Sequence, residues 1–138
     1  MELEKLNVHE TDATTPALTV VMATYNRAST VTRTLQCLAN QDLDPSFYEV
    51  IVVDDGSPDN TQEVVLNAID NVPFKLSYLH HENRGPGYTQ NRGIECARGN
   101  VLMLMADDIW MEPQTLRRHL EYHERNPDQH FALLGGVF

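Results

Sequence analysis

The stretch Val50-Ile51-Val52-Val53-Asp54-Asp55-Gly56-Ser57 ends an apolar run in two aspartates, and so does Val101-Leu102-Met103-Leu104-Met105-Ala106-Asp107-Asp108. Short apolar or β-branched runs bounded by turn residues are typical of buried strands. In an open α/β sheet, ligands bind in the crevice outside the carboxyl ends of the strands. We therefore expect four carboxylates to gather at one edge of one sheet.

Four carboxylates at one edge repel each other unless a cation or hydrogen-bond donors offset their charge. A divalent cation that carries a phosphorylated ligand would supply this offset, because hard cations take oxygen ligands. A single aspartate pair is more often a cap for the helix that follows it. Two pairs at equivalent strand ends instead favour a ligand site.

Strands and helices alternate on either side of these two stretches. We predict strands at 18–24, 48–54, 74–80, 101–106 and 131–134, and helices at 30–40, from 60 to 71, from 87 to near 99, and from 113 onward. Asn60 and Glu63 have the spacing of a capping box at the start of the second helix. This alternation predicts an α/β fold with a mostly parallel sheet and helices on both of its faces.

The chain divides into two parts of unequal size. Residues 1–16 are polar and show no periodicity, which predicts a tail or a loosely docked arm. Residues 17–138 form one domain. Because the last predicted strand is followed at once by the end of the chain, we expect this domain to be incomplete at its C-terminus.

The composition is that of an ordinary globular protein, with 138 residues, 41% hydrophobic and 22% charged. A formal net charge of −10 argues against nucleic acid as a partner, since such proteins need a basic face. Cys37 and Cys96 match no metal spacing or disulfide framework. No secretory signal opens the chain, and its longest apolar run is too short to cross a bilayer. We expect a cytoplasmic protein, with peripheral attachment to a membrane left open.

An ordered set of motifs extends through most of the chain, from about residue 18 to at least residue 120. The set consists of Val20–Arg27, Val52–Ser57, Asn83-Arg84-Gly85, Thr89–Gly93 and Ala106-Asp107-Asp108. In this order and spacing the motifs resemble those of the family 2 glycosyltransferases, which have the Rossmann-like GT-A fold. Each motif by itself is weak, whereas the ordered set is specific.

The resemblance implies roles for residues at three strand ends. Ala23, Thr24 and Tyr25 would line a nucleotide-base pocket, and Asp55 would hold the base through a hydrogen bond. A carboxylate at that position suits an imide N–H, such as that of uracil, and so favours a UDP-sugar. The full set of nucleotide-binding residues that we expect is Ala23, Thr24, Tyr25, Arg27, Asp55, Arg84, Gly85, Asn91 and Asp107.

The acidic pair after the fourth strand corresponds to the DxD-type motif of the family. Asp107 and Asp108 would face the ribose and a Mg²⁺ or Mn²⁺ ion that bridges the two phosphates, where the metal acts as a Lewis acid. Met105 stands where many relatives carry aspartate, so which of the two aspartates coordinates the metal stays open. Gln90 stands where relatives often have a basic residue, so Arg84 or Arg92 would take over a contact with the diphosphate.

The resemblance implies an inverting glycosyltransferase that moves a sugar from a nucleotide sugar to an acceptor hydroxyl, on a glycan, a lipid-linked or a protein acceptor. Such a transfer needs a carboxylate base, which we expect beyond Phe138. The alternative is a non-catalytic nucleotide-binding module or an inactive donor-binding fragment. We also expect a homodimer through the C-terminal edge, because residues 131–138 would leave apolar surface exposed.

Other signals carry less weight. His119 and His123 have a zinc-compatible i, i+4 spacing but do not match the metalloprotease pattern, so we interpret them as exposed helix histidines. Trp110 is expected to pack under the loop after Asp108. An acidic pocket of the response-regulator type is disfavoured because its phosphoacceptor would follow the third strand, and because no lysine follows a later strand here.

Overall fold

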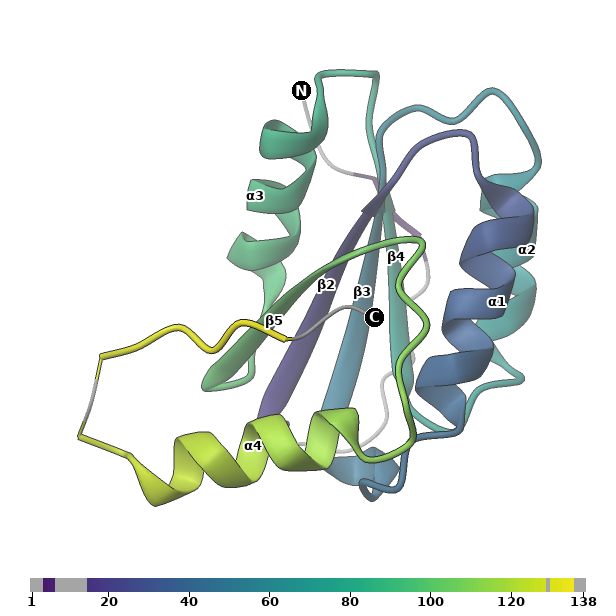
Figure 1. Ribbon diagram of the computed structural model, residues 1–138. Helices are drawn as coiled ribbons and strands as arrows, with labels where there is room; N and C mark the ends of the chain where they lie inside the picture. The colour runs from purple at the N-terminus through teal and green to yellow at the C-terminus, as the bar shows by residue number, and fades with distance from the viewer. Residues whose placement is uncertain (1–3, 7–14, 129, 136–138) are drawn as a thin grey trace.

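Alternating strands and helices make up the computed structural model, which describes residues 4–6, 15–128 and 130–135 (Figure 1). The elements are β1 (Glu4–Leu6), β2 (Leu18–Thr24), α1 (Ala28–Ala39), the 3₁₀ turn η1 (Pro45–Phe47), β3 (Tyr48–Asp54), α2 (Thr61–Ile69), β4 (Lys75–His80), α3 (Pro86–Cys96), β5 (Val101–Ala106) and α4 (Thr115–Arg125).

The five strands form one sheet in the order β1-β4-β3-β2-β5. β2 pairs in parallel with β3 and with β5, and β3 pairs in parallel with β4, whereas β1 is antiparallel to β4. The register places Thr24 opposite Asp54, and Ala23 opposite Ala106. The mostly parallel sheet predicted from the sequence is confirmed, and the carboxyl ends of β2, β3 and β5 meet at one edge.

Helices cover both faces of the sheet, as predicted. Figure 1 shows α1 and α2 against one face and α3 against the other, with α4 across the lower end of the strands. The main core lies between the sheet and α1 and α2, and Leu116 and Leu120 of α4 belong to it. Successive residues of β3 alternate between this core and a smaller cluster that contains Ile51 and Val53. Burial on both faces explains why β3 is apolar almost without interruption.

Gly93 allows α3 to lie close against β2 and β3. A Cβ atom at this position would overlap the Cγ1 atom of Val21 and would come within 3.1 Å of the Cγ2 atom of Val53. Gly87, six residues earlier in the same helix, has no atom within 4 Å of a Cβ built on it. The close packing at Gly93 therefore sets the position of α3, and with it the position of the loop before this helix.

We expect Gly93→Ala to lower the free energy of unfolding by about 1–3 kcal/mol, because the added methyl group overpacks the contact between helix and sheet. Gly87→Ala is the matched control and should be neutral or stabilising by up to about 1 kcal/mol, since alanine is the better helix former. Urea unfolding of the two variants checks this expectation. Equal stability of both variants would contradict the close packing.

Residues 4–6 form a strand that pairs with β4, within the stretch predicted to be a tail or a loosely docked arm. Two local expectations were wrong. Asn60 makes no side-chain hydrogen bond at the start of α2, because Asp59 accepts from the N and Oγ1 atoms of Thr61 instead of the predicted capping box. Residues 131–134 form no strand, since the Phe131 ring packs at 5.2 Å from the Tyr122 ring of α4 and draws this segment toward the helix. Residues 136–138 lie outside the described residues.

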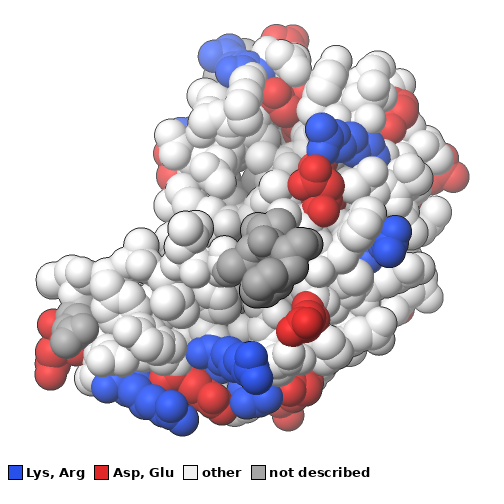
Figure 2. Space-filling view, viewed as in Figure 1, with Lys and Arg blue, Asp and Glu red and all other residues white. Residues whose placement is uncertain are grey.

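The self-association predicted at the C-terminal edge stays a prediction, and the fold points to β5 as its apolar surface. β5 is the last strand of the sheet and carries no charged residue, and its Leu102 and Leu104 are 42% and 48% exposed. Figure 2 shows a largely uncharged, hollowed surface between α3 and α4 in this view. Uncharged edge strands with exposed apolar side chains tend to associate.

We therefore expect the molecular mass by light scattering to rise with protein concentration, and Leu104→Lys to reduce this rise because a charge on an edge strand opposes pairing. Circular dichroism controls for the fold of the variant. A monomer at every concentration of the parent protein would contradict the expectation.

Candidate active site

Asp54 is a structural carboxylate at the end of β3. Its Oδ1 atom accepts hydrogen bonds from the backbone N of Ser57 at 2.8 Å and from the Ser57 hydroxyl at 2.5 Å. Its Oδ2 atom accepts from the Tyr78 hydroxyl at 2.5 Å. Burial, together with this bond to Asp54, raises the pKa of Tyr78 far above its usual range. Asp54 therefore holds the turn after β3 and is not directed at a ligand.

Asp55 fixes the loop that precedes α3. Its Oδ1 atom accepts from the backbone N of Arg84 at 2.7 Å, and its Oδ2 atom accepts from the backbone N of Gly85 at 3.0 Å and from the Asn83 side-chain amide at 3.2 Å. Gly56 makes this approach feasible, because a Cβ atom there would lie 2.9 Å from the backbone N of Asn83. Asp55 thus joins the carboxyl end of β3 to the start of α3.

The loop between β2 and α1 is fixed to the same region. Asn26 adopts a left-handed conformation with φ 54°, and its backbone N donates to the Ser57 hydroxyl at 2.8 Å. The backbone N of Ala28 donates to the Asp59 carboxylate at 3.1 Å. These two bonds hold the backbone on either side of Arg27, so that its side chain starts from a defined position.

The second acidic pair lies opposite this loop, at the end of β5. Asp107 is buried, and its Oδ2 atom accepts from the Thr24 hydroxyl at 2.8 Å while its backbone carbonyl accepts from the Thr34 hydroxyl at 2.5 Å. The Oδ1 atom of Asp107 and the Oδ2 atom of Asp108 both face the Arg27 guanidinium, at 3.1 and 3.4 Å. Asp107 is therefore oriented by the protein, and Asp108 is the more accessible of the two.

Hydrogen-bond donors of the protein offset two of the four carboxylates. The four lie at the same edge of the sheet, but protein donors already satisfy Asp54 and Asp55. Among the residues that the structure describes, no three His, Cys, Asp or Glu side chains converge to form a metal site. Asp107 and Asp108 together still fit Mg²⁺ or Mn²⁺, since such ions are commonly held by one or two carboxylates together with phosphate oxygens and water.

The remaining predicted residues surround this edge with differing exposure. Ala23 and Gly85 are half-buried, whereas Tyr25, Arg84 and Asn91 are exposed. The guanidinium groups of Arg84 and Arg92 lie 5.2 and 5.0 Å from the centre of the Tyr88 ring, so both are near the first turns of α3. The structure thus brings Thr24, Arg27 and Asp107 into direct contact, while it shows no such contact for Asn91 within the described residues.

Sequence reasoning missed three residues of this region. Thr34 holds the backbone of Asp107, and the available signal was a threonine on the apolar face of a helix. His81 is buried, and its Nδ1 atom lies 2.6 Å from the Glu82 carbonyl and 3.6 Å from the Oδ1 atom of Asp55. Tyr88 packs edge-on against His81 with ring centres 5.0 Å apart. No local pattern could have indicated the last two.

The predictions made from the sequence for Trp110 and for the two helix histidines also need correction. Trp110 is half exposed, and the Arg33 guanidinium lies 3.5 Å from its ring centre, so the indole rests beside α1 and not under the loop. His119 and His123 are half-buried, not exposed, and His123 stacks on Phe131 at 4.6 Å. Burial lowers the pKa of His119 below its usual value.

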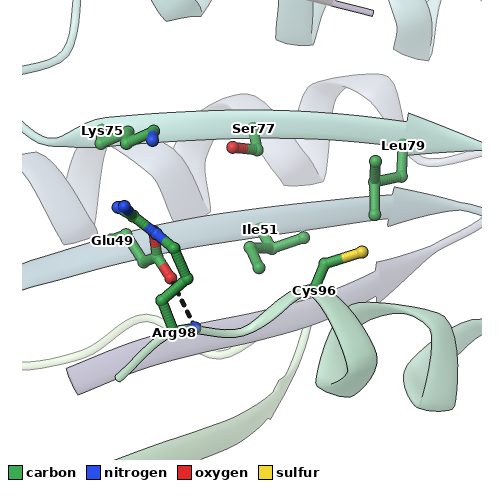
Figure 3. A pocket seen from close by; sticks show the side chains of 7 residues that line it. All are labelled: Glu49, Ile51, Lys75, Ser77, Leu79, Cys96 and Arg98. Carbon is green, nitrogen blue, oxygen red and sulfur yellow. Dashed lines mark hydrogen bonds and ion pairs between the residues drawn. The ribbon is translucent and has the colours of Figure 1, made fainter. Parts of the chain in front are cut away.

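A small cavity of about 70 Å³ lies at the opposite end of the sheet, under the end of α3 (Figure 3). Glu49 is buried there and accepts from the Thr19 hydroxyl, from the Arg98 backbone N and from the Arg98 guanidinium, at distances of 2.9–3.1 Å. Because its donors come from β2 and from the segment after α3, this carboxylate ties elements together. The cavity is therefore separate from the carboxyl edge.

We expect Asp55→Ala to speed amide hydrogen exchange at Arg84 and Gly85 by roughly tenfold or more, because each lost hydrogen bond contributes about 1–3 kcal/mol when its acceptor is charged. Asp108→Ala is the control, since Asp108 faces Arg27 of the loop between β2 and α1. Exchange measured by NMR distinguishes the two variants. Unchanged exchange in Asp55→Ala would show that the loop is held by other contacts.

The fold and its polar edge define the class of the protein, a doubly wound, mostly parallel α/β domain with two aspartate pairs at the carboxyl ends of its strands. The profile of Glycosyl transferase family 2 matches residues 19–133. The chain belongs to this family, and its fold is the GT-A type that the sequence motifs predicted.

Known proteins of related sequence and structure agree with this assignment. The putative glycosyltransferase EpsH of Bacillus subtilis (strain 168) is 36% identical over 101 residues, which are 72% of this chain and 28% of EpsH. S. aureus TarS 1-349 in complex with UDP-GlcNAc superposes with a TM-score of 0.70 and 30% identity, over 78% of this chain and 31% of that chain. The mannosyltransferase PcManGT from Pyrobaculum calidifontis, in complex with GDP-Man and Mn²⁺, gives a TM-score of 0.73 and 28% identity, over 78% and 32%. The chain thus spans about a third or less of these proteins.

Proposed function

We propose that this chain is the nucleotide-sugar-binding part of a metal-dependent glycosyltransferase that transfers a sugar from a nucleoside-diphosphate sugar, with UDP favoured, to an acceptor hydroxyl. The observation that carries the proposal is the pair Asp107 and Asp108, oriented at the carboxyl edge opposite a guanidinium group. Family membership and the UDP-GlcNAc and GDP-Man complexes of the two structural neighbours support it.

The base pocket is proposed between the ends of β2 and β3, at Ala23, Thr24, Tyr25 and Asp55. An ionised carboxylate offers about four lone-pair positions, and the loop before α3 uses three of those on Asp55. By this count one position on Oδ1 remains, and we propose that it accepts one N–H from a base, with the Nδ1 atom of His81 3.6 Å from the same oxygen. This leaves one hydrogen bond for recognition, consistent with a donor edge such as that of uracil.

The diphosphate is proposed to lie between β5 and the start of α3. Bound Mg²⁺ or Mn²⁺ would be held by Asp108 and Asp107 and would stabilise the negative charge that develops on the departing diphosphate. Thr24 keeps the Asp107 carboxylate in one orientation by donating to its Oδ2 atom. Arg84 and Gly85 bring the positive N-terminal end of α3 to the same side, and such helix ends favour anions.

The acceptor side of the reaction is not assigned to any described residue. We infer an inverting transfer with a glycan, lipid-linked or protein acceptor, and a base outside these residues. We therefore expect this chain alone to bind the nucleotide but not to transfer the sugar.

Within the described part of the chain, no helix has the length and apolarity needed to cross a bilayer. A cytoplasmic location is proposed, and the free thiols of Cys37 and Cys96 are consistent with it.

We expect Asp108→Asn to remove the metal-dependent part of the affinity for UDP, with a loss of at least about 10- to 100-fold, since even residues that only support metal ligands have effects of this size. Asp107→Asn should weaken binding as well, and it should also weaken the hydrogen bond that the Thr24 hydroxyl donates to this side chain. Calorimetric titration of UDP with and without Mn²⁺ gives both values.

The matched control is Asp128→Asn, which removes the same charge at an exposed position after α4. Its UDP affinity should equal that of the parent protein. If the parent shows no gain in UDP affinity on addition of Mn²⁺ or Mg²⁺, the proposed function is wrong. Transfer of sugar to an acceptor by this chain alone would show that the base lies within it.

A further inference from the structure

A single guanidinium nitrogen lies between the two carboxylates to which the proposed function assigns a divalent cation. The Nη1 atom of Arg27 is 3.1 Å from the Oδ1 atom of Asp107 and 3.4 Å from the Oδ2 atom of Asp108. The Asp107 side chain is 9% exposed, whereas those of Asp108 and Arg27 are both 52% exposed. Arg27 thus neutralises one nearly buried and one accessible carboxylate from the open side of the site.

This position is the one that a metal ion would need. A Mg²⁺ ion lies about 2.0–2.1 Å from each ligand oxygen, so a cation between the same two oxygen atoms would meet the Arg27 nitrogen at close range. This arrangement is unfavourable, because a divalent cation and a guanidinium about 4 Å apart repel by about 2 kcal/mol even at the dielectric constant of water. Metal binding to the acidic pair therefore requires the guanidinium to move.

The structure allows the side chain to move while the backbone stays. The neighbouring amides of Asn26 and Ala28 are held by Ser57 and Asp59, and the Arg27 carbonyl accepts the first hydrogen bond of α1 from Val31. The half-exposed ion pair itself is weak, since pairs of this kind contribute about 0–1 kcal/mol. A modest gain in free energy on metal binding is enough to displace it.

We propose that Arg27 is an exchangeable counter-ion, which occupies the acidic pair in the absence of metal and is displaced when a divalent cation enters with the nucleotide diphosphate. This inference rests on the proposed function of Asp107 and Asp108. The displaced guanidinium gains a new partner only when a phosphate is present, and guanidinium groups bind phosphate well. The exchange therefore makes metal alone bind weakly and metal with diphosphate bind tightly.

The exchange predicts effects of opposite sign for Arg27→Gln. The affinity for Mn²⁺ alone, measured from the free-ion EPR signal without nucleotide, should rise by up to roughly fivefold, because the metal no longer has to break an ion pair of about 0–1 kcal/mol. With saturating Mn²⁺, the affinity for UDP should fall by a similar factor, because the phosphate contact is lost. Arg27→Lys keeps the positive charge and should leave the affinity for Mn²⁺ alone close to that of the parent.

Arg118→Gln is the matched control, because it removes the same charge at an exposed position on α4. It should alter neither affinity, and thermal unfolding checks that all variants fold. Equal or weaker binding of Mn²⁺ alone by Arg27→Gln would overturn the exchange, as would a lack of Mn²⁺ binding by both parent and variant. Failure of UDP to bind the parent with Mn²⁺ would instead reject the proposed function, and the measurements with metal alone remain informative in that case.

Discussion

The parallel pairing of β2 with β3 on one side and β5 on the other is the constraint on which the rest of the structure depends. It sets Thr24 opposite Asp54, and Ala23 opposite Ala106, so that three chain segments leave the sheet at one level. Parallel strands need a crossover connection, which here brings each helix back over the sheet and returns the chain to the same starting edge. Residues distant in sequence, such as Thr24 and Asp107, thereby come into hydrogen-bond contact.

Buried carboxylates in this fold are stabilised by donors from other elements. Asp54 receives donors from Ser57 and Tyr78, Asp55 from the loop before α3, and Glu49 from Thr19 and Arg98. A buried charge without such partners would be strongly unfavourable. Each of these carboxylates therefore links two chain segments through hydrogen bonds, Glu49 at one end of the sheet and Asp54 and Asp55 at the other. These links hold the edge in place together with the apolar core.

The two acidic pairs differ in what holds them. Asp54 and Asp55 each accept three hydrogen bonds from the protein, which fix the turn after β3 and the loop before α3. Asp107 is fixed on one side by Thr24, and Asp108 depends on the exposed Arg27. An ordered set of ligand atoms next to a movable counter-charge is suited to binding a cation and an anion together. Such a site differs from a preformed metal cage, which needs more ligands than the described residues provide.

The sequence by itself determined the bounds of β2, β3 and β5, their parallel direction and the edge at which the polar residues gather. β2, β3 and β5 have the predicted bounds, because apolar runs that end in turn residues are a local property of the chain. Only the tertiary structure decided which aspartates are satisfied by the protein, because their donors Tyr78, Arg84 and Thr24 come from other elements. The same reason explains the errors. Residues 131–134 have the apolar pattern of a strand, but Phe131 packs on Tyr122 and His123 of α4 and the segment follows the helix. No local pattern in the sequence indicates that α4 lies next to this segment.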